Sequence, residues 1–226
     1  MLRSQFEQQL TKLHRKFYDM GVQVSDAINK AVTSFIDHDR KFANEVIERD
    51  DEINELEIRI EKKSFELIAL QQPVTIDLRI IITVMKASSD LERMGDHAVS
   101  IAKSTIRMKG ETRILSIEGE ISKMSLQVQK MMDAMLNAYI EYDFERAKEI
   151  SKWDSVVNDY YDSIHQKSVQ IMKENPETVV SGHDYLSVAG FLERIGDYVV
   201  NICEWIVYLQ TGKISELTSS NNERTV

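Results

Sequence analysis

Apolar residues recur at spacings of three and four through most of the chain, which is the period of one face of an α-helix. The first stripe ends near Phe35. A second follows Asp39, a residue type that caps helix N-termini. A third begins after Pro73, with Thr75 as its expected cap and Gly110 as its expected stop. Strand-like alternation is sustained nowhere in the sequence. The pattern therefore predicts three long helices in the first 110 residues.

The same plan occurs twice along the chain. Residues 91–102 match residues 192–203 at an offset of 101, with seven identities in twelve, and an upstream match runs at an offset of 104. Pro73 and Pro176 interrupt the two copies at equivalent places. The repeat predicts an all-α fold of two tandem antiparallel three-helix bundles related by internal duplication. The predicted units are residues 1–110 and 111–212, followed by a polar tail, 213–226. The second-unit helices are predicted at 113–141, 144–173 and 179–211, with Asp143 as a cap and Gly212 as a stop.

Composition and charge narrow the class of protein further. Only 2 Pro and 8 Gly occur in 226 residues, too few turn residues for a β-sandwich or a doubly wound sheet. The formal net charge of −9 argues against nonspecific nucleic-acid binding. The charge is uneven, because residues 1–110 carry a net −1 and residues 111–226 a net −8. The single cysteine, Cys203, allows no intramolecular disulfide and suits a reducing cytosol.

The N-terminal residues contain no apolar signal segment, and no apolar run approaches the ~20 residues that span a bilayer. We therefore expect a cytoplasmic protein that meets a membrane only through its partners.

The repeated element that bears candidate chemistry is Glu-Arg-x-Gly-Asp. Glu92 and Asp96 are four residues apart and so share one helix face, as do Glu193 and Asp197. Like charges at this spacing destabilise a helix mildly, and glycine in a helix interior costs about 1 kcal/mol relative to alanine. Both unfavourable choices occur twice. A close helix crossing explains the glycine, and a bound cation explains the acids.

The preceding helix of each unit offers a second pair of oxygen ligands. Asp50 and Asn54 form such a pair in the first unit, and Asp154 and Asn158 in the second. If the helices pack antiparallel, four oxygen-bearing side chains converge in each bundle. Oxygen ligands favour Mg²⁺, Mn²⁺, Ca²⁺ or Fe, with Zn²⁺ less favoured. An alternative stays open, in which Arg93 and Arg194 satisfy the acids through ion pairs without any metal.

Catalysis has little support in the sequence. It contains neither a glycine-rich phosphate loop nor a nucleophile elbow, so we expect a protein that is not an enzyme. A helical-bundle di-metal carboxylate enzyme is the less favoured alternative. Such bundles use Glu-x-x-His pairs, and none occurs here.

The chain resembles the PhoU family of phosphate-transport accessory proteins over about residues 3–212. The resemblance lies in the duplicated Leu-Glu-Arg-[Met/Ile]-Gly-Asp helix, in Gln72-Pro-Val-Thr-Ile-Asp-Leu-Arg79, and in the Asp50–Glu57 segment. It implies two three-helix bundles, a cytoplasmic homodimer, and negative regulation of phosphate uptake and phosphate-starvation signalling. It also implies two partners, the sensor histidine kinase of the phosphate system and the ATP-binding subunit of the phosphate ABC transporter. An accessory role for another phosphate permease is the remaining alternative.

The resemblance also implies metal ligands at the repeated motifs. Carried over by position, the ligands are Glu92, Asp96, Glu193, Asp197, Asp50 and Asp154. Four residues after the last two, the family usually has Asp, whereas this chain has Asn54 and Asn158. Each bundle therefore lacks one charge, which lowers the expected affinity for Mg, Mn, Fe or Zn and argues against a multinuclear cluster.

Overall fold

The computed structural model describes residues 2–214, 216 and 217. This part of the chain forms eight α-helices and one short 3₁₀ helix, and it contains no strand, which confirms the all-α prediction. In chain order the helices are α1 (Leu2–Ile36), α2 (Arg40–Glu48), α3 (Asp50–Gln71), α4 (Thr75–Arg107), α5 (Leu115–Glu141), α6 (Phe144–Ser151), α7 (Asp154–Glu174), η1 (Pro176–Thr178) and α8 (Val179–Thr211). Most of the predicted tail, residues 215 and 218–226, lies outside the described residues.

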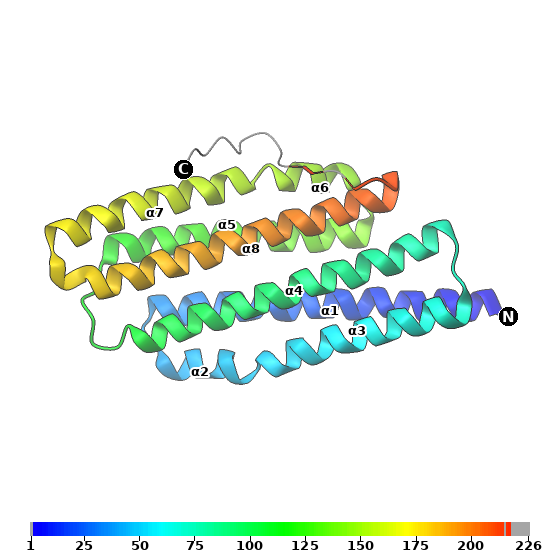
Figure 1. Cartoon of the computed structure of the whole chain (residues 1–226), viewed down its shortest axis with the longest axis horizontal. Helices are drawn as coiled ribbons and strands as arrows, with labels where there is room; N and C mark the ends of the chain where they lie inside the picture. Colours follow the sequence, from blue (N-terminus) through cyan, green and yellow to red (C-terminus); the bar gives the residue numbers. More distant parts are fainter. Residues whose placement is uncertain (1, 215, 218–226) are drawn as a thin grey trace.

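The helices form two antiparallel bundles, α1 to α4 and α5 to α8, which lie side by side along their length (Figure 1). The prediction of three helices per unit was wrong in one respect, because the middle helix is broken in both. The first break is at Arg49, and the second is at Lys152 and Trp153. Backbone bonds at both breaks span three residues instead of four, as in a 3₁₀ turn. Each break places an aspartate, Asp50 or Asp154, at the first residue of the next helix.

The helix ends test the predicted caps. Asp39 accepts hydrogen bonds from the backbone N–H groups of Lys41 and Phe42, and Asp143 accepts one from Arg146, so both predicted caps are confirmed. Gly212 ends α8 with a left-handed φ of 68°, as predicted. The cap prediction for Thr75 was wrong. Thr75 is itself the first residue of α4, and its φ is 42°.

The bundles meet along an antiparallel seam between α4 and α8, the most extensive contact between helices in the described chain. The ring of His97 on α4 stacks between Phe191 and Tyr198 of α8, with centroids 5.6 and 5.8 Å away. Near one end of the seam, Arg107 donates two hydrogen bonds to Asp184, at 3.0 and 2.6 Å. The Glu-Arg-x-Gly-Asp segments of both repeats thus lie on the two helices that join the bundles.

Candidate functional site

The four motif acids lie near the middle of α4 and α8, next to the helices that begin at the breaks. α3 packs on α4 and α7 packs on α8, and the charge of Asp96 acts on Asp50 as the charge of Asp197 acts on Asp154. The breaks matter for this placement. A carboxylate at the first residue of a helix is favoured by the partial positive charge of the helix N-terminus. Asp50 and Asp154 occupy that position, and the two sites therefore share one local design.

The motif glycines allow the close helix crossing that the sequence predicts. A β-carbon on Gly196 would lie 2.9 Å from Oδ1 of Asp154 and 3.4 Å from Val157. A β-carbon on Gly95 would lie 3.3 Å from the side chain of Ile53. Such contacts are shorter than ordinary van der Waals distances. The glycines are thus needed where α3 meets α4 and where α7 meets α8, beside the candidate ligands.

In the first bundle, neighbouring carboxylates influence one another's pKa values. Burial raises the pKa of Asp50, and the charge of Asp96 raises it further, while a hydrogen bond of 3.4 Å from Nδ2 of Asn54 to Oδ2 lowers it. Burial also raises the pKa of Glu92, with additional contributions from Asp96, Glu57 and Asp50. The structure thus places Asp50 and Asn54 of α3 close enough to Glu92 and Asp96 of α4 for the carboxylates to interact electrostatically.

The second bundle repeats this arrangement with a more deeply buried aspartate. Asp154 is 6% exposed, and burial together with the charge of Asp197 raises its pKa to about 6. Asn158 donates a hydrogen bond of 2.7 Å from Nδ2 to Oδ2 of Asp154, which acts in the opposite direction. Burial raises the pKa of Asp197, and Arg194 lowers it. Glu193 lies one turn from Asp197 on α8. A shallow hollow is lined by Glu193, Arg194, Asp197, Tyr198, Val200 and Asn201.

The chemistry of these residues suits a cation. Oδ1 of Asp50, Oδ1 of Asn54 and Oδ1 of Asp154 are buried and have no hydrogen-bond partner within the described chain. Unpartnered carboxylate and amide oxygens are the donors that hard divalent cations prefer. The described residues contain, however, no group of three or more His, Cys, Asp or Glu placed closely enough to hold a metal. The donors therefore fit a cation in kind, and a complete shell requires side-chain movement or added water.

One arginine of the repeated motif interacts mainly with an aromatic side chain and not with the motif acids. The guanidinium of Arg93 lies 6.0 Å from the centre of the Tyr198 ring on α8, and a hydrogen bond to Tyr198 raises its pKa. Arg93 therefore links the two bundles across the seam. The charge of Arg93 lowers the pKa of Glu92, but burial and the neighbouring acids have larger effects and raise it.

Sequence reasoning missed one further pair of acids, Asp90 on α4 and Glu204 on α8. Burial raises the pKa of Asp90 to about 6, and the charge of Glu204 adds to this effect, while Arg93 and Lys86 oppose it. Burial also raises the pKa of Glu204. The repeat comparison could not identify Asp90, because its counterpart at the offset of 101 is Phe191. Only the antiparallel seam brings these two carboxylates near each other.

No helix in the described part of the chain is both long enough and apolar enough to cross a membrane.

Comparisons with known proteins agree with this architecture. The family model for the PhoU domain matches residues 17–105 and 121–206, one copy in each bundle. The phosphate-specific transport system accessory protein PhoU homolog of Clostridium acetobutylicum is 38% identical over 218 residues, covering 96% of this chain and 99% of that protein. The homolog from Streptococcus pneumoniae serotype 4 is 34% identical over 216 residues, covering 96% of this chain and all of that protein.

Two solved structures also match the fold of this chain. The crystal structure of the phosphate transport system regulatory protein PhoU from Streptococcus pneumoniae matches with a TM-score of 0.88 at 33% identity, covering 93% of this chain and 99% of that one. PhoU from Pseudomonas aeruginosa matches with the same TM-score and identity, covering 92% of this chain and 100% of that one. These names describe accessory and regulatory proteins, not enzymes. The chain belongs to the PhoU family.

Proposed function

We propose that this chain is a negative regulator of phosphate uptake and of phosphate-starvation signalling. It acts by contacting the ATP-binding subunit of a phosphate ABC transporter and the associated sensor histidine kinase. The observation that supports the proposal is the family match in both bundles, to relatives named as accessory proteins of phosphate-specific transport.

The direct test is an interaction experiment with purified components. The full chain is immobilised and presented with the ATP-binding subunit, with the cytoplasmic part of the sensor kinase, and with an unrelated ABC ATPase as a control. We expect the first two proteins to bind and the third not to bind. Binding to neither would overturn the proposed link. Binding only to another phosphate permease would support the alternative accessory role.

A genetic experiment tests the direction of regulation. Deletion of the gene should leave phosphate uptake and the starvation response active when phosphate is plentiful, and expression of the full chain should restore repression. An uptake rate in phosphate-rich medium that deletion leaves unchanged would contradict negative regulation.

We further propose that each bundle holds a divalent cation at its acidic motif. The observation that favours this is the set of buried, unpartnered oxygens on Asp50, Asn54 and Asp154 beside the motif acids. The cation would be held by Asp50, Asn54, Glu92 and Asp96 in one bundle, and by Asp154, Asn158, Glu193 and Asp197 in the other. When bound, it supplies positive charge that offsets the mutual repulsion of these carboxylates.

The metal proposal is tested by elemental analysis of purified protein. Replacement of Glu92 and Asp96 together by alanine should remove the metal of the first bundle, and circular dichroism should show that helix content is retained. Asp77→Ala, a change at the start of α4 away from the site, serves as the control. Metal content that the double replacement leaves unchanged would exclude these ligands.

A further inference from the structure

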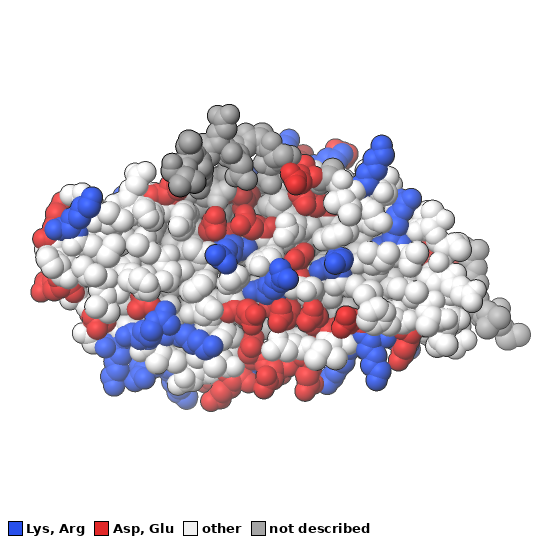
Figure 2. Space-filling view, viewed as in Figure 1, with Lys and Arg blue, Asp and Glu red and all other residues white. Residues whose placement is uncertain are grey.

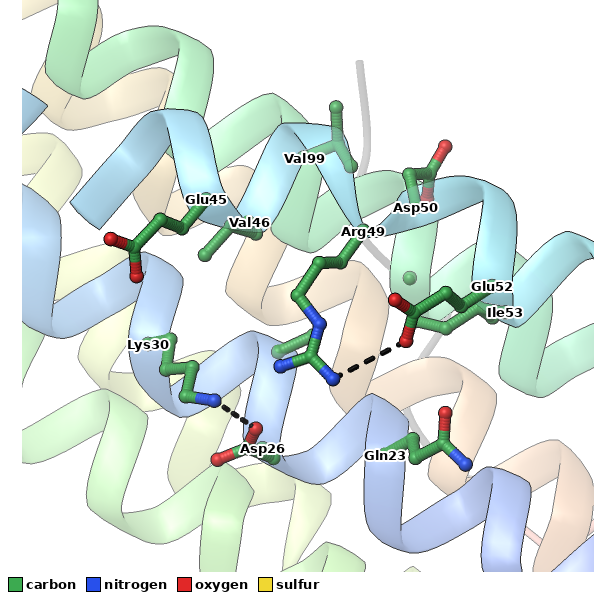
Figure 3. Close-up of a pocket in the computed structure, with 12 residues that line it drawn as sticks. Gln23, Asp26, Lys30, Glu45, Val46, Arg49, Asp50, Glu52, Ile53 and Val99 are labelled. Atoms are coloured by element: carbon green, nitrogen blue, oxygen red, sulfur yellow. Dashed lines mark hydrogen bonds and ion pairs between the residues drawn. The ribbon is translucent and has the colours of Figure 1, made fainter. Parts of the chain in front are cut away.

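The first bundle contains a pocket that borders the candidate metal site, because Asp50 is one of its lining residues. It opens between α1 and the break that separates α2 from α3 (Figure 3). Its enclosed volume is about 60 Å³. Because a single water needs roughly 10–15 Å³ by this measure, the pocket has room for a few waters or one group of side-chain size. The inner wall is apolar and consists of Ala27, Val46, Ile53, Gly95 and Val99.

Three of the corresponding positions of the second bundle carry larger side chains, whereas Val157 is smaller than its counterpart Ile53. At the offset of 104, Ala27 corresponds to Met131 and Val46 corresponds to Ile150. Both of these larger residues are completely buried. Arg49, at the break between α2 and α3, corresponds to Trp153. The second bundle thus fills with its own side chains a region that the first bundle leaves open.

Trp153 shows what kind of group suits this location. Nζ of Lys130 on α5 lies 4.9 Å from the ring centre, and Cζ of Arg146 on α6 lies 4.8 Å from it. The indole ring therefore covers the groove between α5 and α6, with two cations over it. A cation over the face of an aromatic ring contributes about 0.5–1 kcal/mol at an exposed site.

The rim of the open pocket supplies two cations as well. Lys30 pairs with Asp26 at 2.5 Å, and Arg49 pairs with Glu52 at 3.3 Å. The two members of the second pair are 58% and 57% exposed, and exposed ion pairs of this kind contribute little to stability. Figure 3 shows the guanidinium of Arg49 at the mouth of the pocket, between Lys30 and Glu52. Because its ion pair is exposed, Arg49 can rearrange around an incoming ring at small cost.

We propose that this pocket binds a single aromatic side chain presented by a protein partner. The ring occupies the space that Met131, Ile150 and Trp153 fill in the second bundle, and its face lies against Lys30 and Arg49. One buried aromatic anchor in a pocket with a polar rim is a common centre of protein–protein binding energy. The proposal rests on the proposed function in one respect: a regulator has a protein partner, and that partner presents the aromatic side chain.

The rim charges exclude a different ligand class. Asp26, Glu45 and Glu52 outnumber the two cations, so a phosphate or a phosphorylated peptide would meet net negative charge. In Figure 3 the carboxylate of Asp50 points away from Lys30 and Arg49. Asp50 also lines the pocket, so the pocket borders the oxygens assigned to the candidate metal site.

The binding test uses N-acetyl-L-tryptophanamide as the probe. The full chain, with labelled isoleucine and valine methyl groups, is titrated with the probe to about 20 mM and followed by NMR, since one isolated side chain binds only in the millimolar range. We expect saturable shifts at Val46, Ile53 and Val99. N-acetyl-L-leucinamide and N-acetyl-L-lysinamide should bind about three to five times more weakly, the factor that a cation over a ring accounts for.

A variant that carries the second bundle's residues provides the control. Ala27→Met combined with Arg49→Trp should fill the pocket and abolish the shifts, while thermal unfolding confirms that the fold is intact. If that combination does not fold, Arg49→Ala alone should keep the pocket and remove the preference for the aromatic probe.

Three outcomes would overturn the proposal: absence of shifts at these methyl groups, shifts that persist in the filled variant, or tighter binding of the lysine probe. Because no transporter subunit or kinase takes part, a failed interaction experiment for the proposed function leaves this result unaffected.

Discussion

At the scale of single residues, the motif glycines and the Asp-Asn pairs form one arrangement. Gly196 leaves room for Asp154, and Gly95 leaves room for Ile53 at the equivalent crossing. The two crossings differ in what a methyl group would meet. In the second bundle it is the oxygen of a buried carboxylate, whereas in the first it is a flexible aliphatic side chain. An added methyl group is therefore tolerated less well at Gly196 in the second bundle than at Gly95 in the first.

Replacement of Gly196 by alanine should lower the free energy of unfolding by about 1–3 kcal/mol, because the new methyl group would displace Asp154. Gly119→Ala is the matched control. Nothing in the described part of the chain lies within 4 Å of a β-carbon there, so this replacement should raise stability by about 0.5–1 kcal/mol. Urea unfolding measures both changes. Equal effects of the two replacements would show that the crossing at Gly196 is not tight.

Restoration of aspartate at Asn54 and Asn158 should raise metal affinity if the acidic motifs hold cations. Each change adds one negative charge and one anionic oxygen, and affinity in such sites rises with ligand charge. We expect Mn²⁺ to bind at least about tenfold more tightly to the double variant in calorimetric titration. An unchanged affinity would place the metal elsewhere.

At the scale of elements, two of the three predicted helix N-caps form and one does not. Asp39 and Asp143 cap their helices through direct hydrogen bonds, whereas Thr75 makes no capping bond. The two aspartates have a φ of −87° and a ψ of 95° or 87°, and their side chains reach the backbone of the first turn. Thr75 instead has a left-handed φ of 42°, which lies outside the backbone region of the two capping aspartates. A residue type that favours the N-cap therefore forms a cap only where its backbone adopts the conformation of an N-cap.

Removal of the Asp39 cap by alanine should cost about 1 kcal/mol in unfolding free energy, because two backbone N–H groups lose their acceptor. Thr75→Ala should change stability by less than about 0.5 kcal/mol, since no capping bond is lost. Thermal unfolding of the two variants tests the difference. A loss of stability in Thr75→Ala as large as in Asp39→Ala would contradict it.

At the scale of the whole molecule, a buried carboxylate ties the two bundles together. Glu118 on α5 is 3% exposed and accepts hydrogen bonds from Arg113 at 2.5 Å and from the hydroxyl of Tyr185 on α8 at 2.6 Å. His38, from the loop after α1, lies 2.9 Å away. Burial alone would raise the pKa of Glu118, but the hydrogen bonds from Arg113, Tyr185 and His38 outweigh it, and the pKa is lowered.

This network predicts a pH-dependent contribution to stability. Because the pKa of Glu118 is lower in the folded state than the ordinary 4.5, its contribution is complete above pH 4.5 and is lost as pH falls through the folded-state value. Glu118→Gln should therefore cost about 2–4 kcal/mol at pH 7 and less below pH 4.5. Urea unfolding across this pH range measures the difference.

Glu145→Gln is the control for that experiment, because Glu145 forms an ion pair while being 79% exposed. Its removal should cost less than about 0.5 kcal/mol at neutral pH. A cost for Glu118→Gln that does not change with pH would show that ionisation of this carboxylate does not hold the bundles together.

The sequence by itself determined the helical class, the duplication and the pairing of acids with amides in each repeat. These features follow from spacing along one helix, which is a local property: residues four apart share a face whatever the rest of the chain does. The same reasoning placed glycines where helices cross. It did not show that the middle helix of each unit breaks, since no proline or glycine occurs at Arg49 or Trp153.

Only the tertiary structure decided what lies between elements. The antiparallel seam of α4 and α8 brings Asp90 near Glu204 and places His97 between two aromatic rings, although these partners are about a hundred residues apart in the chain. The open pocket of the first bundle likewise depends on how α1, α2, α3 and α4 pack around Ala27 and Val46. Such contacts are set by which helix faces pack together, because burial and the interaction between charges depend on distance in space and not on separation along the chain.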